Sequence, residues 1–109
     1  MSISSEPSSF SIAVSSRPDE TVVSLAGELD IATASVVEQT FADLRRSGVQ
    51  RILLDLEGMT FMDSRGLRTL LCLRNDAKRD RSVLRLTQPA EAAQQVFTLT
   101  GTRGLFDWT

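Results

Sequence analysis

The chain has 109 residues and a formal net charge of −2, with no histidine and a single cysteine. A chain of this length forms one domain, and its slight negative charge argues against a nucleic-acid partner and provides no polybasic anchor for a membrane surface. The lack of histidine excludes His-based acid–base catalysis and most zinc sites, and a lone cysteine excludes an internal disulfide and fits a reducing compartment such as the cytoplasm.

The first part of the chain predicts a tail followed by a hairpin. Residues 1–9 are rich in serine and predict a flexible N-terminal tail, which leaves residues 10–109 as the folded domain. Residues 10–14 alternate large apolar with small side chains, the pattern of a half-buried strand. After a turn, residues 21–26 are apolar and rich in β-branched side chains and predict the return strand, which Gly27 is expected to end.

The middle of the chain predicts helix, strand and helix. Residues 30–33 offer several N-cap candidates, and apolar residues recur at helical spacing over 34–44. Residues 51–56 are a short apolar run, which indicates a strand covered on both faces, as in a parallel sheet. A polar turn then leads to a second helix that begins near Ser64. Cys72 falls within the apolar pattern of this helix and is interpreted as a core or near-core residue.

The last part of the chain predicts a strand over residues 83–87, a third helix and a final short strand that begins at residues 105–106. Pro89 suits the first turn of the third helix, and Gly101 its end. The apolar face of that helix is expected to comprise Ala92, Val96 and Leu99. Short connections and right-handed crossovers then predict an α/β fold, a small mixed sheet of about four or five strands with helices packed on it.

Ser64 is the most informative residue, because it stands where the polar turn becomes the second helix. A helix start exposes unpaired N–H groups and the positive end of the helix dipole, so an anion is stabilised there. A phosphate on Ser64 would add about −1.5 to −2 charges at that point. The alternative is that Asp63 or Ser64 only caps the helix, and spacing alone does not make a capping serine a phosphorylation site.

The neighbours of Ser64 add further features. Gly66 allows another backbone to approach closely. Arg65 and Arg68 lie in the first turn, where the dipole disfavours positive charge, so their side chains could pair with a phosphate or with a partner's carboxylate. The predicted turn also contains three large apolar side chains, which either fill the core or contact a partner: Met59, Phe61 and Met62.

The segment Gly27-Glu28-Leu29-Asp30 follows the second predicted strand and precedes the first helix. It is either a strand end with an N-cap or an acidic rim beside Ser64. The chain contains neither G-x-x-x-x-G-K-[ST] nor G-x-G-x-x-G, so no nucleotide cofactor is expected, and no metal site is expected either.

Three segments together resemble the STAS domain, and more closely the bacterial anti-sigma factor antagonists. They are Gly27-Glu28-Leu29-Asp30-Ile31-Ala32-Thr33-Ala34, Leu53-Leu54-Asp55-Leu56 and Phe61-Met62-Asp63-Ser64-Arg65-Gly66-Leu67. The resemblance covers about residues 10–107. It implies a small mixed sheet with helices, and a protein without enzymatic activity that binds an anti-sigma factor that is also a serine kinase and so frees the sigma factor.

The resemblance also implies a switch at Ser64. The kinase would phosphorylate this serine, the partners would separate, and a metal-dependent serine phosphatase would reset the switch. The residue after the serine is often Ser or Thr in antagonists, whereas here it is Arg65, which could change kinase recognition or pair with the phosphate. Asp30 matches the family's acidic residue near the serine, and the expected partner-binding set is Asp30, Met62, Asp63, Arg65, Gly66 and Arg68.

Two other functions stay open at this point. The first is a STAS subunit of a lipid or anion transport system, which would act as a structural partner of an ATPase or permease. The second is a small hydrolase, which would need a substrate cleft that the sequence does not indicate. The expectation is therefore a monomeric cytoplasmic regulator without a cofactor, whose partners are an anti-sigma factor with kinase activity and a serine phosphatase, with neither nucleic acid nor membrane as a partner.

Overall fold

The computed structural model describes residues 10–109, and the tail predicted at residues 1–9 lies outside this range. The described chain forms five strands, three α-helices and one short 3-10 helix. In chain order these are β1 (Phe10–Ser16), β2 (Thr21–Leu29), α1 (Ala34–Arg46), β3 (Arg51–Met62), α2 (Ser64–Asp80), β4 (Val83–Leu86), α3 (Glu91–Thr100), η1 (Arg103–Leu105) and β5 (Asp107–Trp108). None of the helices within residues 10–109 has the length and apolar character that a membrane span requires.

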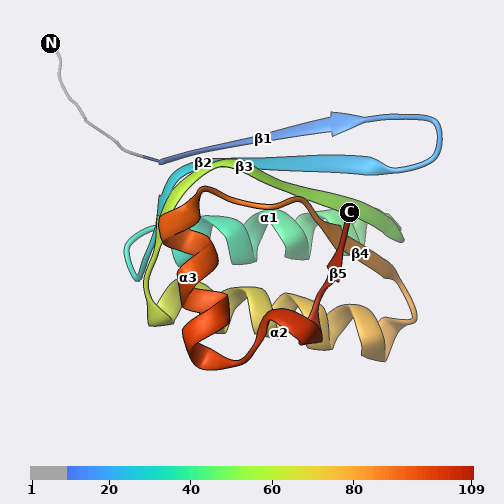
Figure 1. Cartoon of the computed structure of the whole chain (residues 1–109). Helices are drawn as coiled ribbons and strands as arrows, with labels where there is room; N and C mark the ends of the chain where they lie inside the picture. The colour runs from blue at the N-terminus through green and yellow to red at the C-terminus, as the bar shows by residue number, and fades with distance from the viewer. Residues whose placement is uncertain (1–9) are drawn as a thin grey trace, which may run out of the picture.

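The strands form one mixed sheet in the order β1-β2-β3-β4-β5. β1 and β2 are an antiparallel hairpin, whereas the remaining neighbours, β2–β3, β3–β4 and β4–β5, are parallel. Parallel neighbours need a crossover connection, and right-handed crossovers that all step in one direction place α1, α2 and α3 on the same side of the sheet (Figure 1). The prediction of a mixed α/β sheet with helices packed on it is confirmed.

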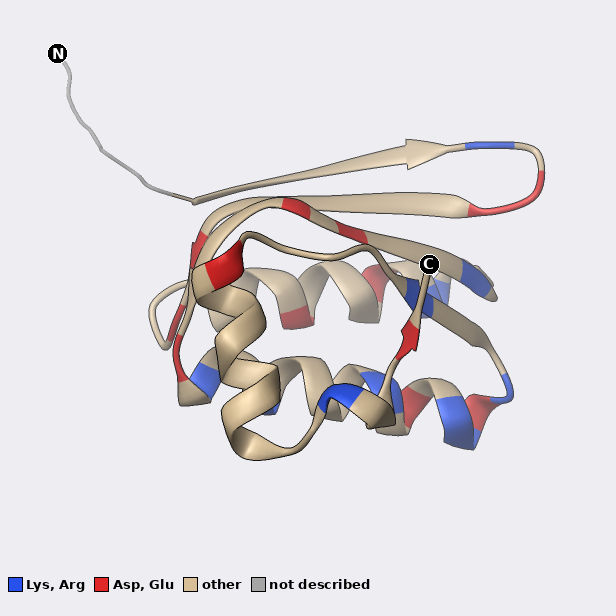
Figure 2. Ribbon diagram, viewed as in Figure 1, with Lys and Arg blue, Asp and Glu red and all other residues tan. Residues whose placement is uncertain are grey.

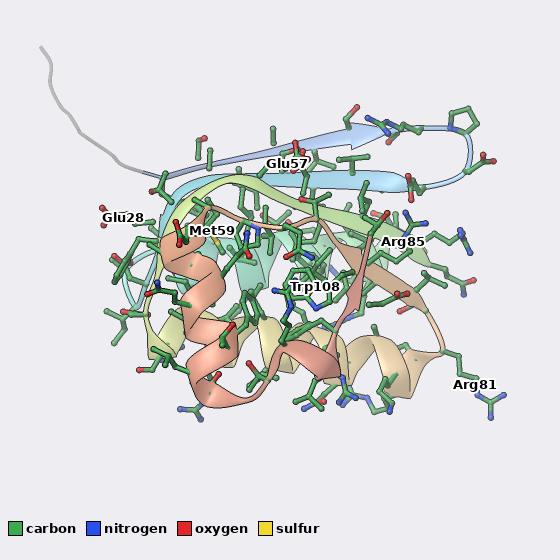
Figure 3. All side chains as sticks on the ribbon, in the orientation of Figure 1. Glu28, Glu57, Met59, Arg81, Arg85 and Trp108 are labelled. Atoms are coloured by element: carbon green, nitrogen blue, oxygen red, sulfur yellow. The ribbon has the colours of Figure 1, made fainter. Side chains whose placement is uncertain are left out.

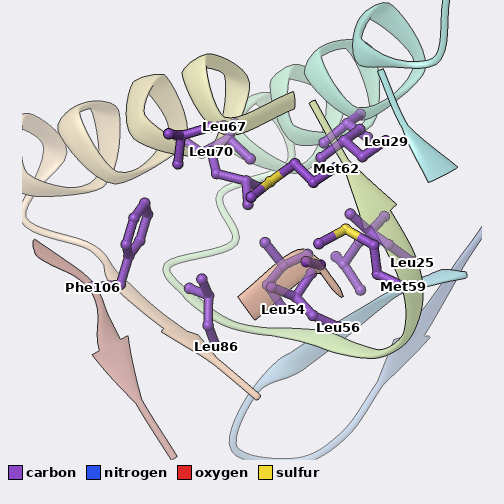
Figure 4. Close-up of a cluster of buried hydrophobic side chains, with 14 of the residues drawn as sticks. Leu25, Leu29, Leu54, Leu56, Met59, Met62, Leu67, Leu70, Leu86 and Phe106 are labelled. Atoms are coloured by element: carbon purple, nitrogen blue, oxygen red, sulfur yellow. The ribbon is translucent and has the colours of Figure 1, made fainter. Parts of the chain in front are cut away.

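The core fills the space between the sheet and the helices (Figure 4). Along β3 the burial alternates, since Leu54 is fully buried while Leu53 is only half-buried. The prediction that this strand is covered on both faces therefore holds only in part, because the helices cover one face. The centre of the core comprises Val23, Leu25, Val37, Leu54, Leu56, Met59, Leu70, Leu86 and Phe97.

The two central strands are longer than the sequence predicted. β2 does not end at Gly27 but continues to Leu29, and β3 does not end at Leu56 but continues to Met62. Their pairing shifts register twice, between Ser24 and Ala26 and again next to Gly27, which has a φ of 95°. Bulges of this kind let a strand continue past a glycine. The residues after Leu56 that were predicted as a polar turn form the last part of β3.

The third helix buries a different face from the one predicted. The helix begins at Glu91, so Pro89 precedes it and is not part of its first turn. Its buried residues are Ala93 and Phe97, whereas Leu99 is 83% exposed. Phe97 is turned inward because it packs edge-to-face against aromatic rings that the last strand brings to it, at centroid distances of 5.4 Å (Phe106) and 5.0 Å (Trp108).

At the C-terminal end, one prediction is confirmed and another is displaced by two residues. Gly101 ends α3 in the left-handed conformation, as predicted, with a φ of 71°. The final strand begins at Asp107, two residues later than expected, because a 3-10 turn occupies Arg103–Leu105.

Cys72 is exposed on α2, so its interpretation as a core residue is wrong. The neighbouring positions Leu70 and Leu73 face the core instead.

Candidate functional site

At the start of α2, the residue that caps the helix and the residue that could accept a phosphate are different. Asp63 is the N-cap, and its carboxylate Oδ1 accepts a hydrogen bond of 2.9 Å from the Gly66 N–H. Ser64 is the first residue of the helix and is exposed, and its hydroxyl makes no hydrogen bond within residues 10–109. The prediction of a helix start at Ser64 is confirmed, and the capping that the sequence could assign to either residue belongs to Asp63.

The first turn of α2 lies directly against the end of β2. The Asp63 N–H donates to the Leu29 C=O at 3.2 Å. A Cβ on Gly66 would lie 2.5 Å from that same oxygen and 2.8 Å from Cγ of Met62, closer than real Cβ atoms approach. The predicted close approach of a backbone to Gly66 is therefore present, and the backbone is the chain's own.

The Asp30 carboxylate is used by its own loop. Its Oδ1 accepts hydrogen bonds from the N–H groups of Ala32 (2.9 Å) and Thr33 (3.1 Å). In return, the Asp30 N–H donates to the Thr33 hydroxyl at 2.9 Å. These bonds order the loop between β2 and α1. The same loop contains Ile31, which is 70% exposed. Asp30 therefore shapes the loop that leads to α1, whose N-cap is Thr33.

The two arginines of the first turn differ in their surroundings. Arg65 Nη2 lies 3.8 Å from Glu38 Oε2 on α1, and each of these side chains is about 40% exposed. Arg68 is exposed and forms no ion pair within residues 10–109. Sequence reasoning missed Glu38, because only the packing of α1 beside α2 brings it to Arg65.

Two exposed apolar side chains lie close in sequence to Leu29 and Asp63, the residues that join the end of β2 to the start of α2. Ile31 stands in the loop after β2, and Phe61, near the end of β3, is 44% exposed. Met62, the residue after Phe61, is buried because neighbouring positions of a strand face opposite sides. We call Ile31, Phe61, Ser64, Arg65 and Arg68 the Ser64 surface.

Two members of the predicted partner-binding set are buried. Met62 and Gly66 are both buried, so neither offers an exposed side chain to a partner in this conformation. Figure 3 shows Met59 pointing inward in the same way, whereas Glu28 points away from the molecule.

The charges near this end of the molecule are mixed. Figure 2 shows acidic and basic residues side by side around the start of α2. Within residues 10–109 no three His, Cys, Asp or Glu side chains converge into a group that could hold a metal ion. What the arrangement offers is a serine hydroxyl at a helix start, two arginines and two exposed apolar side chains.

The fold and the site define a class of protein, a small α/β domain with one antiparallel and three parallel strand pairs that exposes a serine at the start of its second helix. Residues 12–107 match the family model described as "Mlab, STAS domain". The chain belongs to the STAS domain family, as its sequence motifs indicated.

Named relatives include bacterial antagonists. The chain is 26% identical over 83 residues to the anti-sigma-B factor antagonist of Staphylococcus aureus (strain NCTC 8325 / PS 47), which covers 76% of this chain and 77% of that protein. The fold of this chain is similar to that of an anti-sigma factor antagonist from Mycobacterium paratuberculosis, with a TM-score of 0.79 and 24% identity. The match covers 94% of this chain and 87% of that one. SpoIIAA in its unphosphorylated form gives a TM-score of 0.75 at 21% identity, covering 91% and 88%.

Proposed function

We propose that this chain is an anti-sigma factor antagonist whose partner binding is switched at Ser64. The observation that carries the proposal is the state of Ser64: it is exposed and first in α2, and its hydroxyl makes no hydrogen bond within residues 10–109, since Asp63 caps the helix. A kinase needs an accessible hydroxyl, and an exposed serine that does not cap the helix provides one. The relative from Staphylococcus aureus, named as an anti-sigma-B factor antagonist, supports the same function.

The Ser64 surface would bind the anti-sigma factor while Ser64 is unmodified. Ile31 and Phe61 offer apolar area that a partner can cover. Arg65 and Arg68 offer donors for a partner's carboxylates. Asp30, Met62, Asp63 and Gly66 act indirectly, because their contacts fix the loop and the helix start that carry this surface.

A phosphate on Ser64 would end the binding without unfolding the domain. It would place about −1.5 to −2 charges on a surface that the partner has to desolvate, and a loss of a few kcal/mol at an interface lowers affinity by several hundred-fold. The Bacillus protein SpoIIAA has been solved in a phosphorylated form, whose fold is similar to this chain with a TM-score of 0.67 at 23% identity. The anti-sigma factor would act as the kinase, and a separate serine phosphatase would restore the hydroxyl.

The proposal assigns the chemistry to the partners and none to this chain. The phosphate comes from the kinase's own nucleotide, so the chain needs no cofactor and acts as a regulator in the cytoplasm. The alternative, a STAS subunit of a lipid or anion transport system, would use the same fold to bind an ATPase or permease. It predicts binding that does not depend on the modification of Ser64.

The test is intact mass and peptide mapping of the chain purified from its native cells, followed by binding of variants to the co-purified partner. We expect a phosphate on Ser64 in a fraction of the molecules, and none on Ser64→Ala. Ser64→Asp should bind the partner at least about 10-fold more weakly than Ser64→Ala. The matched control is Ser47→Asp, which changes another exposed serine, at the far end of α1.

Two results would contradict the proposal. One is a stoichiometric phosphate on Ser64→Ala, which would place the acceptor elsewhere. The other is equal binding of Ser64→Asp and Ser64→Ala to a partner that proves to be a transport ATPase or permease, which would favour the alternative.

A further inference from the structure

Within residues 10–109, no charge, proline or bulge protects the outer strand of the sheet. β1 is the terminal strand, and in Figure 1 it runs along the top of the sheet with the described chain on one side of it only. Its register with β2 is unbroken from Phe10 to Ser16, and the strand contains no charged residue and no proline. Natural edge strands are usually protected by charges, prolines or bulges, and an edge without them is a template on which another strand can pair.

The hairpin turn determines which backbone groups of β1 face outward. The Arg17 N–H donates to the Glu20 C=O at 2.9 Å, which makes these two residues a hydrogen-bonded pair. Such pairs alternate with non-bonded pairs along an antiparallel ladder. Ser15, Ala13 and Ser11 are therefore bonded to β2, and the N–H and C=O groups of Ser16, Val14 and Ile12 point to the free edge.

We propose that two copies of this chain pair antiparallel through their β1 edges, with Val14 of one copy opposite Val14 of the other. In this register Ile12 of each copy lies opposite Ser16 of the other. The outward groups of Ile12, Val14 and Ser16 then form about six hydrogen bonds between the copies. The two five-stranded sheets become one continuous sheet across a two-fold axis.

The side chains are self-complementary in this register. Phe10 and Ile12 pack against the core, so Val14 points to the same face, where it is 48% exposed. The two Val14 side chains would cover each other on that face. On the opposite face, Ala13 of each copy meets the small side chain of Ser15 of the other. No charged residue of β1 opposes a like charge, because β1 has none, and this favours a second copy over a charged peptide as the occupant.

The two-fold axis of the pairing lies away from the Ser64 surface. Val14 lies opposite Val23 on β2, six residues before the Leu29 that contacts the start of α2, a span of about 20 Å along the strand. The inference does not depend on the proposed antagonist function. Since the interface is one strand wide, we expect a weak dimer, with a Kd of about 0.1–1 mM, and the expected monomer at lower concentration.

The first test is sedimentation equilibrium of the full chain between about 10 µM and 1 mM. Wild type should show a rising dimer fraction. Val14→Pro and Val14→Lys should stay monomeric: the proline removes an outward N–H without removing a β1–β2 bond, and the lysine sets two ammonium groups at the two-fold axis. The control is Leu99→Lys, a charge at an exposed leucine of α3, which should dimerise like wild type. A wild type that is monomeric at 1 mM, or a Val14→Lys that dimerises like wild type, overturns the proposal.

The second test reads the register in a Cys72→Ser background, because Cys72 is exposed and would otherwise form disulfides. Under mild oxidation Val14→Cys should give a disulfide-linked dimer, since the two Cα atoms of a directly opposed pair lie within disulfide range. Ala13→Cys, one residue away, should link much more slowly, because Ala13 lies opposite Ser15 and points to the other face. Equal linking of the two variants overturns the proposed register.

Discussion

The substitution Gly66→Ala tests how tightly α2 is set against β2. The new Cβ would lie 2.5 Å from the Leu29 carbonyl oxygen, and this atom belongs to backbone that cannot rotate away. To restore a distance of 3.0 Å the helix start must retreat by about 0.5 Å. That movement weakens the 3.2 Å bond from the Asp63 N–H to the same oxygen, worth about 0.5–1.5 kcal/mol.

Overpacking adds a cost of about 1–3 kcal/mol, and the better helix propensity of alanine returns at most about 1 kcal/mol. We expect Gly66→Ala to be less stable than wild type by about 1–3 kcal/mol, which lowers the Tm by about 4–8 °C per kcal/mol. Urea unfolding followed by circular dichroism measures this, with Gly104→Ala as the control, because a Cβ there meets nothing within 4 Å. If Gly66→Ala equals or exceeds the stability of wild type, the close approach of α2 to β2 is wrong.

Three further substitutions test the packing by the same unfolding assay. Asp63→Ala loses the cap bond and should cost about 0.5–2 kcal/mol; a cost near zero would mean that another group caps α2. Thr87→Val should cost about 1–3 kcal/mol, because the Thr87 hydroxyl accepts a 2.8 Å bond from the Leu56 N–H; Thr87→Ser should retain most of the stability. Phe97→Ala should cost about 3–5 kcal/mol, whereas Leu99→Ala should stay within about 0.5 kcal/mol of wild type; similar losses for the two would contradict the assigned face of α3.

Local chemistry made the order of elements and the start of α2 predictable. A helix needs a cap, and an acidic residue followed by a serine and then an apolar helical pattern marks that point whatever the rest of the chain does. Gly101 is a second example, because glycine at a helix end readily adopts the positive φ that other residues disfavour. Gly66 is a third example, because a residue without a side chain at a helix start indicates that a backbone can approach it closely.

The lengths of β2 and β3 were not predictable in the same way. Gly27 and the polar residues after Leu56 read locally as chain breaks, yet the strands run on to Leu29 and Met62. A strand continues wherever a neighbouring strand supplies hydrogen-bond partners, and bulges let the register adjust. That supply comes from residues about thirty positions away, which no local pattern contains.

The face that α3 buries was also beyond the sequence. The spacing of Ala92, Val96 and Leu99 satisfies a helical stripe as well as that of Ala93 and Phe97 does. The choice between the two stripes was made by Phe106 and Trp108, whose rings meet Phe97 edge-to-face only after β5 has joined the sheet.

The sequence by itself therefore determined the α/β class, the order of the elements, the helix start at Ser64 and the family motifs, because each depends on residues within a few positions of one another. Only the tertiary structure decided that Glu38 meets Arg65, and that Met62 is buried while Phe61 is exposed. These outcomes depend on contacts between segments that are distant in the chain, and such contacts are settled by packing and hydrogen bonding across the whole domain.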